Sequence, residues 1–401
     1  MHVLLVTTGY PPEHSGSGGR IHQLYTRLAA KHPELCWSVV TKRHDLLRSA
    51  MSVLGPTSVT ALTASARHSR VARIWEAARE ILWTRRQVAQ GLLEDVDLVH
   101  CGGWTWFTFE ISRLACMQGI PVLRELTSVG DAALSGGPGA WLIRYTNRLA
   151  DELVAISPGL EAGVRHSGVR TPIWCRPNGV DLSRFHLPSD AERALGRRTL
   201  RQWIPNMPDD ATVVLHIGRI RPLKNQLFLA DCVARLPKHF HLFMAGPAYE
   251  SSDPYLAEIR QRLAASDLSG RAALAIGQHD TVERFMYGAD MFALPSEKEG
   301  LGTAMIEALA CGLPVVAHEI VGVTDWIIET GVNGRLSALE ETRFAEALLE
   351  NEPLCRRRSE IAAAAACRFD STAVDEEYWR RITRLARRRV VPCGPASAAS
   401  P

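Results

Sequence analysis

The chain has 401 residues and a formal net charge of +3, with 46% hydrophobic and 22% charged residues. This composition excludes a mainly disordered chain, and the small net charge gives no sign of a nucleic-acid-binding protein. The nine cysteines form no CxxC pair, which argues against a disulfide framework or a structural zinc site and favours a reducing cytoplasm.

The N-terminus predicts a buried strand. MHVLLVTTGYPPEHSG turns polar after a few apolar residues and lacks the basic region of a signal peptide. Nowhere do about 18 consecutive apolar residues occur, so we expect no transmembrane helix. These features predict a cytoplasmic protein that at most contacts the inner face of a membrane.

Short apolar segments recur along the chain with helical segments between them. The first half contains HVLLVTT, CWSVVTK, VDLVHC, PVLREL and ELVAIS, and the second half contains TVVLHIG, FHLFMAG, AALAIG, DMFALP and LPVVAH. Apolar strands that alternate with helices indicate parallel sheets covered on both faces. The sequence therefore predicts an α/β fold in which the pattern occurs twice.

A glycine-rich stretch, PPEHSGSGGRIHQLYTRLA, follows the first strand and opens a helix. A loop at this place can face phosphate or an acceptor, so we expect Gly18 and Gly19 to line a ligand cleft. The glycine spacing does not match G-x-G-x-x-G, and no acidic partner follows the second strand, which excludes a dinucleotide fingerprint. The alternative is a flexible turn.

The segment RHSRVARIWEAAREILWTRR places apolar residues on one helical face among many arginines, and these residues are Val71, Ile74, Trp75, Ala78 and Leu82. Together with the arginines of residues 380–389, such a helix could position the protein against a lipid-linked acceptor at a membrane surface. The alternative is a helix that packs on its own sheet and exposes a solvated basic face.

Two polar features flank the strand VDLVH. The sequence DVD at Asp95–Asp97 imitates a metal-binding motif, but it begins this strand, so its carboxylates should lie at the edge opposite the ligand crevice. We therefore expect no bound metal. His100 ends the strand and is a candidate site residue, although a structural role is the alternative.

The stretch RPNGVDLSRFHLPSD, from Arg176 to Asp190, has the proline and glycine content of an interdomain connection. We expect four segments, which are a first domain over residues 1–188, a second over 189–372, a C-terminal helix over 373–390 that returns to the first domain, and a disordered tail over 391–401.

Two cations follow a buried strand of the second half, in HIGRIRPLKN. Arg219 and Lys224 should lie at the carboxyl edge of the sheet, where ligands bind in open parallel sheets. Two cations there can neutralise a diphosphate and stabilise the charge of a departing nucleoside diphosphate. Ordinary loop charges are the alternative.

Two glutamates flank a glycine-rich turn in PSEKEGLGTAMIEALACGLPVVA. Glu299 precedes Gly300 and Gly302, and Glu307 lies on the predicted helix from Thr303 to Gly312. Eight helical residues would rise roughly 12 Å, so the two carboxylates suit the two ends of an elongated ligand, such as a nucleotide sugar, better than one metal ion. The alternative is a solvated acidic loop and a helix-surface glutamate.

These stretches resemble the retaining glycosyltransferases of family 4, which have the GT-B fold of two facing Rossmann-like domains. The resemblance rests on GRIRPLKN, LPSEKEGLGTAMIEALACGLPVVA, RPNGVDLSRF and GVNGRL. It covers most of residues 150–385 and, more loosely, the first domain.

The resemblance implies a role for each matching residue of the second domain. Arg219 and Lys224 would hold the donor diphosphate, Glu299 would contact the donor sugar, and Glu307 would bind the ribose. Backbone N–H groups would come from Leu301, Gly302 and Thr303, and Gln278 would lie near the nucleobase.

The first domain departs from the resemblance at one place. Many relatives carry a histidine near the reaction centre, whereas here the strand ends in VLRELTSVGD. We therefore expect Thr127, Ser128 or Asp131 to meet the acceptor, with His100 as the remaining histidine.

Taken together, the sequence predicts a metal-independent, retaining hexosyltransferase that uses a nucleoside diphosphate sugar, UDP- or GDP-linked, as co-substrate and needs no cofactor. The acceptor would be a glycan, a lipid-linked saccharide or a small molecule. Two alternatives stay open: a GT-B-like nucleotide-sugar epimerase, and a sugar-nucleotide-binding regulator without turnover.

Overall fold

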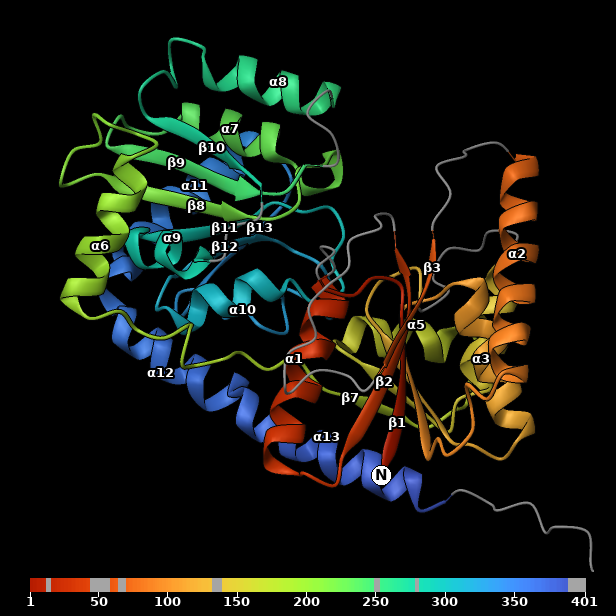
Figure 1. Ribbon diagram of the computed structural model, residues 1–401. Coiled ribbons are helices and arrows are strands. Elements are labelled where there is room, and N and C mark those ends of the chain that lie inside the picture. Colours follow the sequence, from red (N-terminus) through yellow and green to blue (C-terminus); the bar gives the residue numbers. More distant parts are fainter. Residues whose placement is uncertain are drawn as a thin grey trace, which may run out of the picture. The chain divides into compact units, whose positions relative to one another are not determined.

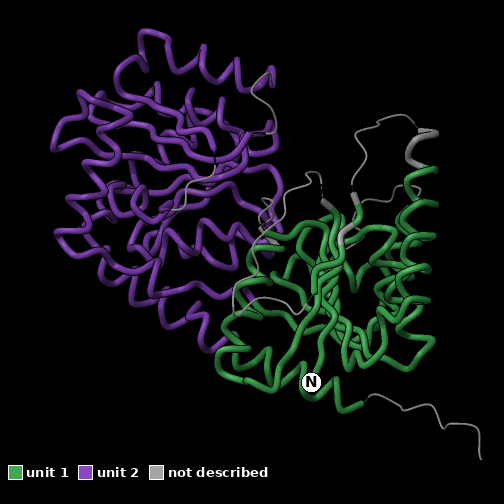
Figure 2. Tube along the Cα trace, viewed as in Figure 1, with its two compact units in different colours: residues 1–176, 375–401 green, residues 177–374 purple. Residues whose placement is uncertain are grey.

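The computed structural model describes residues 1–11, 16–43, 58–63, 70–131, 139–248, 253–277 and 281–388. The chain divides into two compact units, which Figure 2 distinguishes by colour. Unit 1 comprises residues 1–176 and 375–401, and unit 2 comprises residues 177–374. The chain thus enters unit 2 at Pro177, inside the stretch that was expected to connect the domains, and returns to unit 1 at Asp375.

Unit 1 contains a seven-stranded sheet in the order β3-β2-β1-β4-β5-β6-β7, and every strand pairing in it is parallel. The central strands are buried because their residues are apolar on both faces. The strands are β1 (His2–Thr7), β2 (Cys36–Arg43), β3 (Ser58–Thr63), β4 (Leu98–Gly102), β5 (Val122–Leu126), β6 (Glu152–Ala155) and β7 (Ile173–Cys175).

Helices cover both faces of this sheet. Figure 1 shows α2 and α3 on one side and α1 and α13 on the other. Local sequence explains the helix starts, since Thr105 and Ser157 each accept a backbone hydrogen bond at an N-terminus. The helices are α1 (Gly16–Lys31), α2 (Arg70–Ala89), α3 (Trp106–Met117), α4 (Ala140–Arg148), α5 (Pro158–His166) and α13 (Ser371–Ala386).

The C-terminal helix α13 packs on unit 1, as the sequence predicted. Arg27 of α1 donates two hydrogen bonds to Asp375, at 2.6 and 2.9 Å. The Tyr378 hydroxyl donates to the buried carboxylate of Glu125. Further along α13, Arg381 and Arg384 both pair with Glu152. The last helix therefore completes the core of the unit that the chain builds first.

Unit 2 contains a six-stranded parallel sheet in the order β10-β9-β8-β11-β12-β13. Its strands are β8 (Thr212–Ile217), β9 (Phe240–Gly246), β10 (Ala272–Ile276), β11 (Met291–Leu294), β12 (Val315–His318) and β13 (Gly334–Ser337). Its helices are α6 (Asp190–Arg201), η1 (Pro222–Lys224), α7 (Gln226–Ala234), α8 (Pro254–Leu263), α9 (Val282–Gly288), α10 (Thr303–Ala310), α11 (Glu341–Asn351), η2 (Glu352–Arg357) and α12 (Arg358–Phe369).

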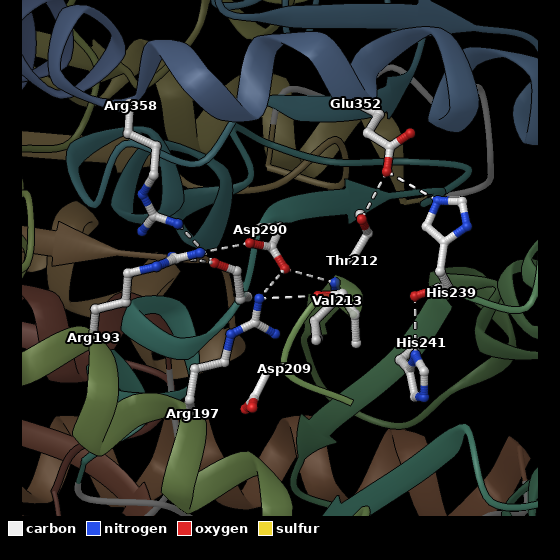
Figure 3. Close-up of polar contacts among 12 residues, drawn as sticks. Arg193, Arg197, Asp209, Thr212, Val213, His239, His241, Asp290, Glu352 and Arg358 are labelled. Carbon is white, nitrogen blue, oxygen red and sulfur yellow. Dashed lines mark hydrogen bonds and ion pairs between the residues drawn. The ribbon is translucent and has the colours of Figure 1, made fainter. Parts of the chain in front are cut away.

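An arginine cluster fastens α6 to the amino edge of this sheet. Arg193 and Arg197 point toward Asp290, which accepts from them at 2.7 and 2.8 Å (Figure 3). Asp290 also accepts from the backbone N–H of Val213 at 2.8 Å, while Arg358 donates to the carbonyl of Ala289 at 2.7 Å. Because these four charged side chains all have partners within the unit, we assign the cluster to stability.

Among the described residues, no helix combines the length and the apolar character needed to cross a membrane.

Candidate active site

Two adjacent strands of unit 2 deliver the predicted donor-binding residues to one edge. β8 and β11 pair in parallel, with Met291 opposite Val214 and Phe292 opposite Leu215. Their following loops therefore emerge side by side at the carboxyl edge, where ligands of open parallel sheets bind. The first loop carries Arg219 and Lys224, and the second carries Glu299.

The two loops are joined directly. The Asn225 side chain donates to the carbonyl of Pro295 at 2.9 Å, and the Glu297 backbone N–H donates to the carbonyl of Leu223 at 3.0 Å. The Lys224 ammonium pairs with the Glu299 carboxylate, and the two side chains are only 21% and 10% exposed. The structure thus brings together two residues that the sequence had singled out separately.

A buried histidine supports the first loop from below. Nδ1 of His216 donates to the carbonyl of Ala293 at 2.9 Å, and Nε2 lies 3.4 Å from Nε2 of Gln226. Gln226 in turn donates to the carbonyl of Arg219 at 3.0 Å. Burial lowers the pKa of His216 to about 4, so the ring is neutral at physiological pH and acts as a spacer between the loops.

The loop after β8 also touches the end of β9 closely. Gly246 has a φ of 154°, and a Cβ atom there would lie 2.0 Å from the carbonyl oxygen of Gly218. The Gly218 N–H donates to the carbonyl of Ala245 at 3.0 Å. Only glycine permits this approach, so the contact fixes the backbone of the residue that precedes Arg219 against the end of β9.

Helix α10 begins at the residue that the sequence predicted, Thr303. Gly302 precedes it with a left-handed φ of 80°, and no side chain caps the helix. The amide of Asn178 donates to the Thr303 hydroxyl at 3.1 Å, whereas its buried carbonyl oxygen has no partner among the described residues. Leu301, beside Gly300, is buried. An uncapped helix N-terminus attracts phosphate, because its first N–H groups point outward.

Glu307 lies one turn further along α10 and is half-buried. Desolvation raises the pKa of its carboxyl to about 7, and the attraction of Arg184 opposes this rise. That guanidinium is itself paired with Glu283 at 2.8 Å. Because burial removes water from the Glu307 carboxylate, its oxygens are well suited to accept hydrogen bonds from ligand hydroxyls.

Gln278 lies outside the described residues, so the structure does not place it. The strand before it, β10, ends at the same edge of the sheet, with β9 between it and β8.

In unit 1, the part of the glycine-rich stretch from Gly16 onward begins with the first turn of α1. Helix α1 begins at Gly16, so Gly18 and Gly19 are helical residues. Arg20 follows them and forms an ion pair with the Glu125 carboxylate at the end of β5. The two glycines thus belong to the helix and not to a loop before it, and their place in a ligand cleft stays a prediction.

His100 is enclosed by unit 1. Its Nδ1 lies 2.8 Å from the Tyr25 hydroxyl, and its Nε2 lies 4.0 Å from Oε1 of Glu125. Burial lowers the pKa of His100 to about 4, and the side chain has no exposed surface. These surroundings favour the structural alternative for this histidine.

The three other candidates of unit 1 form one closed turn. Oδ2 of Asp131 accepts from the backbone N–H groups of Thr127 and Ser128, both at 3.0 Å, and from their hydroxyls at 2.9 and 3.0 Å. Below the turn, Nε of the buried Arg124 donates to Asn147 at 2.7 Å. The Asn147 amide donates to the Asp131 carbonyl at 3.2 Å. Asp131 therefore shapes the turn, which presents the Thr127 and Ser128 hydroxyl oxygens.

The motif at Asp95–Asp97 lies at the opposite edge, as predicted. Oδ2 of Asp97 accepts from the backbone N–H of His2 at 2.8 Å, at the start of β1. Asp97 therefore lies at the amino edge of the sheet, where it binds the first backbone N–H of β1.

Sequence reasoning missed several residues that build these two sites, namely Arg124, Asn147, Asn178, His216, Asn225 and Gln226. His216 and Arg124 carried a signal, since a polar or charged residue inside an apolar strand such as TVVLHI or VLREL needs a buried partner.

Comparisons with known proteins agree with this geometry. Residues 15–184 match the family described as Glycosyltransferase Family 4, and residues 211–351 match Glycosyl transferases group 1. A D-inositol 3-phosphate glycosyltransferase of Mycobacterium tuberculosis is 32% identical over 293 residues, covering 69% of this chain and 58% of that protein. One from Stackebrandtia nassauensis is 31% identical over 234 residues, covering 54% and 50%. The alignments thus span about half the length of these curated relatives.

Solved structures share the fold. Sucrose-phosphate synthase from Thermosynechococcus elongatus superposes with a TM-score of 0.79 at 20% identity, covering 96% of this chain and 98% of that one. Anabaena HepE, in complex with UDP and glucose, has a TM-score of 0.72 at 20% identity, covering 95% and 99%. Both neighbours have the GT-B fold. Because the chain has two parallel sheets and family models match both of its halves, it belongs to glycosyltransferase family 4.

Proposed function

We propose that this chain is a retaining glycosyltransferase of glycan biosynthesis. It moves a sugar from a UDP- or GDP-linked donor to an acceptor hydroxyl without a bound metal. One observation carries the proposal: the Lys224–Glu299 pair joins two loops at the carboxyl edge of unit 2, beside the uncapped start of α10. Cation, carboxylate and helix N-terminus together match a sugar attached to a diphosphate.

Each group has a distinct task in this proposal. The donor diphosphate replaces Glu299 as the ion-pair partner of the Lys224 ammonium, and it also binds Arg219 and the first N–H groups of α10. Glu299 is then released to accept hydrogen bonds from sugar hydroxyls. Glu307 accepts from the ribose, which compensates the desolvation that raises its pKa to about 7.

The transfer step needs no protein nucleophile. The acceptor oxygen bonds to the anomeric carbon from the face that the diphosphate leaves, and the bond from that carbon to the phosphate oxygen breaks with its electron pair. The acceptor proton passes to a donor phosphate oxygen. Arg219 and Lys224 stabilise the charge of the departing nucleoside diphosphate, so they act more strongly on the transition state than on the bound donor.

Several facts support the finer parts of the proposal. The neighbouring structure of HepE is a complex with UDP and glucose, which favours a UDP-linked donor. The eight cysteines among the described residues are unpaired thiols, which suits a cytoplasmic reaction. The matched relatives are named D-inositol 3-phosphate glycosyltransferases, so small phosphorylated polyols belong in the acceptor panel beside glycans and lipid-linked saccharides.

A donor screen tests the proposal. Purified protein is incubated with uridine, guanosine and thymidine diphosphate sugars, and nucleoside diphosphate release is followed for wild type and Glu299→Ala. We expect release from one donor, lost in the variant. Binding without release in the presence of acceptor extracts would instead indicate a regulator, and sugar conversion without release would indicate an epimerase.

A further inference from the structure

Unit 1 exposes its large apolar side chains on one surface. Six large hydrophobic residues of its described part are exposed, and all six belong to α2, α3 or α4. They are Ile74, Trp75, Leu82, Met117, Trp141 and Tyr145. Helix α3 contacts both α2 and α4, so the three helices form one continuous layer, which we call the α2–α4 face.

The apolar residues of α2 form a stripe on its solvent side. Ile74, Trp75 and Leu82 are 71%, 72% and 65% exposed. Trp75 and Leu82 are seven residues apart, with Arg79 and Arg86 at intermediate and following positions of the same stripe. A helix that only packs on its own sheet would turn its tryptophan inward and polar residues outward. Here the solvent side is apolar and basic.

Helix α4 repeats this arrangement. Trp141, 62% exposed, precedes the exposed Tyr145 by four residues, and Arg148 follows on the same side. Phe109 of α3 packs against Tyr145, with ring centroids 6.2 Å apart, which links the aromatic groups of neighbouring helices. Amphipathic aromatic rings of this kind are enriched at the interface between lipid and water.

The carboxylates of these helices are withdrawn from the surface. Glu76 and Glu80 both pair with Lys42, and Glu110 pairs with Arg85 and Arg113. The side chains of the three glutamates are between 2% and 20% exposed. Among the described side chains of the three helices, the exposed charged residues are therefore arginines, namely Arg79, Arg85, Arg86 and Arg148.

From this combination of exposed aromatic groups and charge of one sign, we infer that the α2–α4 face docks on the surface of an anionic lipid bilayer. Arginines attract the negative headgroups, and tryptophan and leucine insert at the boundary with the acyl chains. A second copy of the chain is a poor occupant, because a twofold contact would set the same arginines against each other. The inference goes beyond sugar transfer, since docking needs no turnover.

The arginines of α13 take no part in this surface, contrary to the expectation for residues 380–389. Arg381 and Arg384 pair with Glu152 of β6, and α13 covers the opposite side of the sheet from α2 (Figure 1).

Vesicle sedimentation tests the inference on the full chain. Wild type is mixed with vesicles of phosphatidylcholine alone or of phosphatidylcholine with phosphatidylglycerol, at low and high salt. We expect binding to the anionic vesicles only, weakened by salt. Trp75→Ser with Leu82→Ser should lower the affinity about tenfold or more, and Arg86→Glu should lower it about tenfold.

Matched changes on unit 2 control for general effects. Val321→Ser removes an 80% exposed apolar side chain, and Arg356→Glu reverses an exposed charge; neither should change vesicle binding. Thermal unfolding and donor-dependent nucleoside diphosphate release report whether each variant is folded. Absence of wild-type binding to anionic vesicles, or equal loss in the unit 2 variants, would overturn the inference. So would a wild-type dimer in solution that Trp75→Ser dissociates.

Discussion

Lys224 and Glu299 form an ion pair between loops that follow different strands of one parallel sheet. A partly exposed pair of this kind contributes only about 0–1 kcal/mol to folding. We therefore expect Lys224→Met to leave the melting temperature nearly unchanged while lowering donor-dependent nucleoside diphosphate release about 10²–10³-fold. Lys298→Met, at an exposed neighbouring lysine, is the control and should keep its activity. Equal losses in both variants would contradict the role of Lys224.

We expect Glu307 to lower the stability of the folded chain at high pH while it contributes to donor binding. Its folded-state pKa of about 7 exceeds the value of about 4.3 in an unfolded chain. The folded state therefore holds an extra proton between these values, and stability falls as pH rises through this window. Glu307→Gln should raise the free energy of unfolding at pH 8 by about 1–2 kcal/mol and flatten its pH dependence, while weakening donor binding.

Denaturant titrations between pH 4.5 and 8, with donor affinity measured by calorimetry, check this expectation. Glu297→Gln changes an exposed glutamate in the preceding loop and should alter neither quantity. A destabilised Glu307→Gln at pH 8 would show that the carboxylate is compensated within the folded chain.

His216 should make the protein sensitive to mild acid. Its folded-state pKa of about 4 lies below the unfolded value of about 6.5. Its contribution is therefore complete above pH 6.5 and is lost as pH falls from there toward 4, because the unfolded chain takes up the proton first. His100, also with a pKa of about 4, adds the same dependence in unit 1.

The variant His216→Asn keeps a donor for the Ala293 carbonyl but cannot titrate. We expect its free energy of unfolding to change less between pH 6.5 and 4.5 than that of wild type. His166→Asn, at an exposed helix end, should follow the wild-type curve. The measurement is chemical denaturation at fixed pH values, and parallel curves for wild type and His216→Asn would contradict the expectation.

We expect Asp131 to contribute both to the stability of unit 1 and to sugar transfer to the acceptor. One of its carboxylate oxygens accepts four hydrogen bonds from Thr127 and Ser128. Asp131→Asn weakens all of them, so we expect a loss of about 2–3 kcal/mol of stability. Sugar transfer should fall more than slow donor hydrolysis by water, since the residues proposed to bind the donor belong to unit 2. Asp209→Asn, at a 96% exposed side chain, is the control, and equal losses of transfer and hydrolysis would exclude an acceptor-side role.

The central strands could be predicted from the sequence, whereas three of the four edge strands could not. HVLLVTT and DMFALP correspond to β1 and β11, because their residues are apolar on both faces. The strands β3, β7 and β13 were missed, and each lies at an edge of its sheet. The fourth edge strand, β10, was predicted because its sequence AALAI is apolar. An edge strand is covered less completely, so short or polar sequences such as IWC and GRLS suffice there.

The candidate site divides in the same way. Lys224, Glu299 and Thr303 belong to short motifs whose place at a strand end or helix start is local information. Asn225 and Asn147 act through backbone groups of distant loops, so their roles appear only when the chain is folded. The Lys224–Glu299 pair itself could not be foreseen, because the pairing of β8 with β11 brings together residues 75 positions apart.

The return of α13 to unit 1 bears on the order in which the protein forms during synthesis. The Arg20 and Glu125 side chains are made early, yet the tyrosine that completes their buried network, Tyr378, follows all of unit 2. The growing chain must therefore hold unit 1 in an unfinished state until unit 2 and the start of α13 have been translated. A stop codon just after residue 374 would leave unit 2 with all its strands. It would destabilise unit 1, which would lose most of α13.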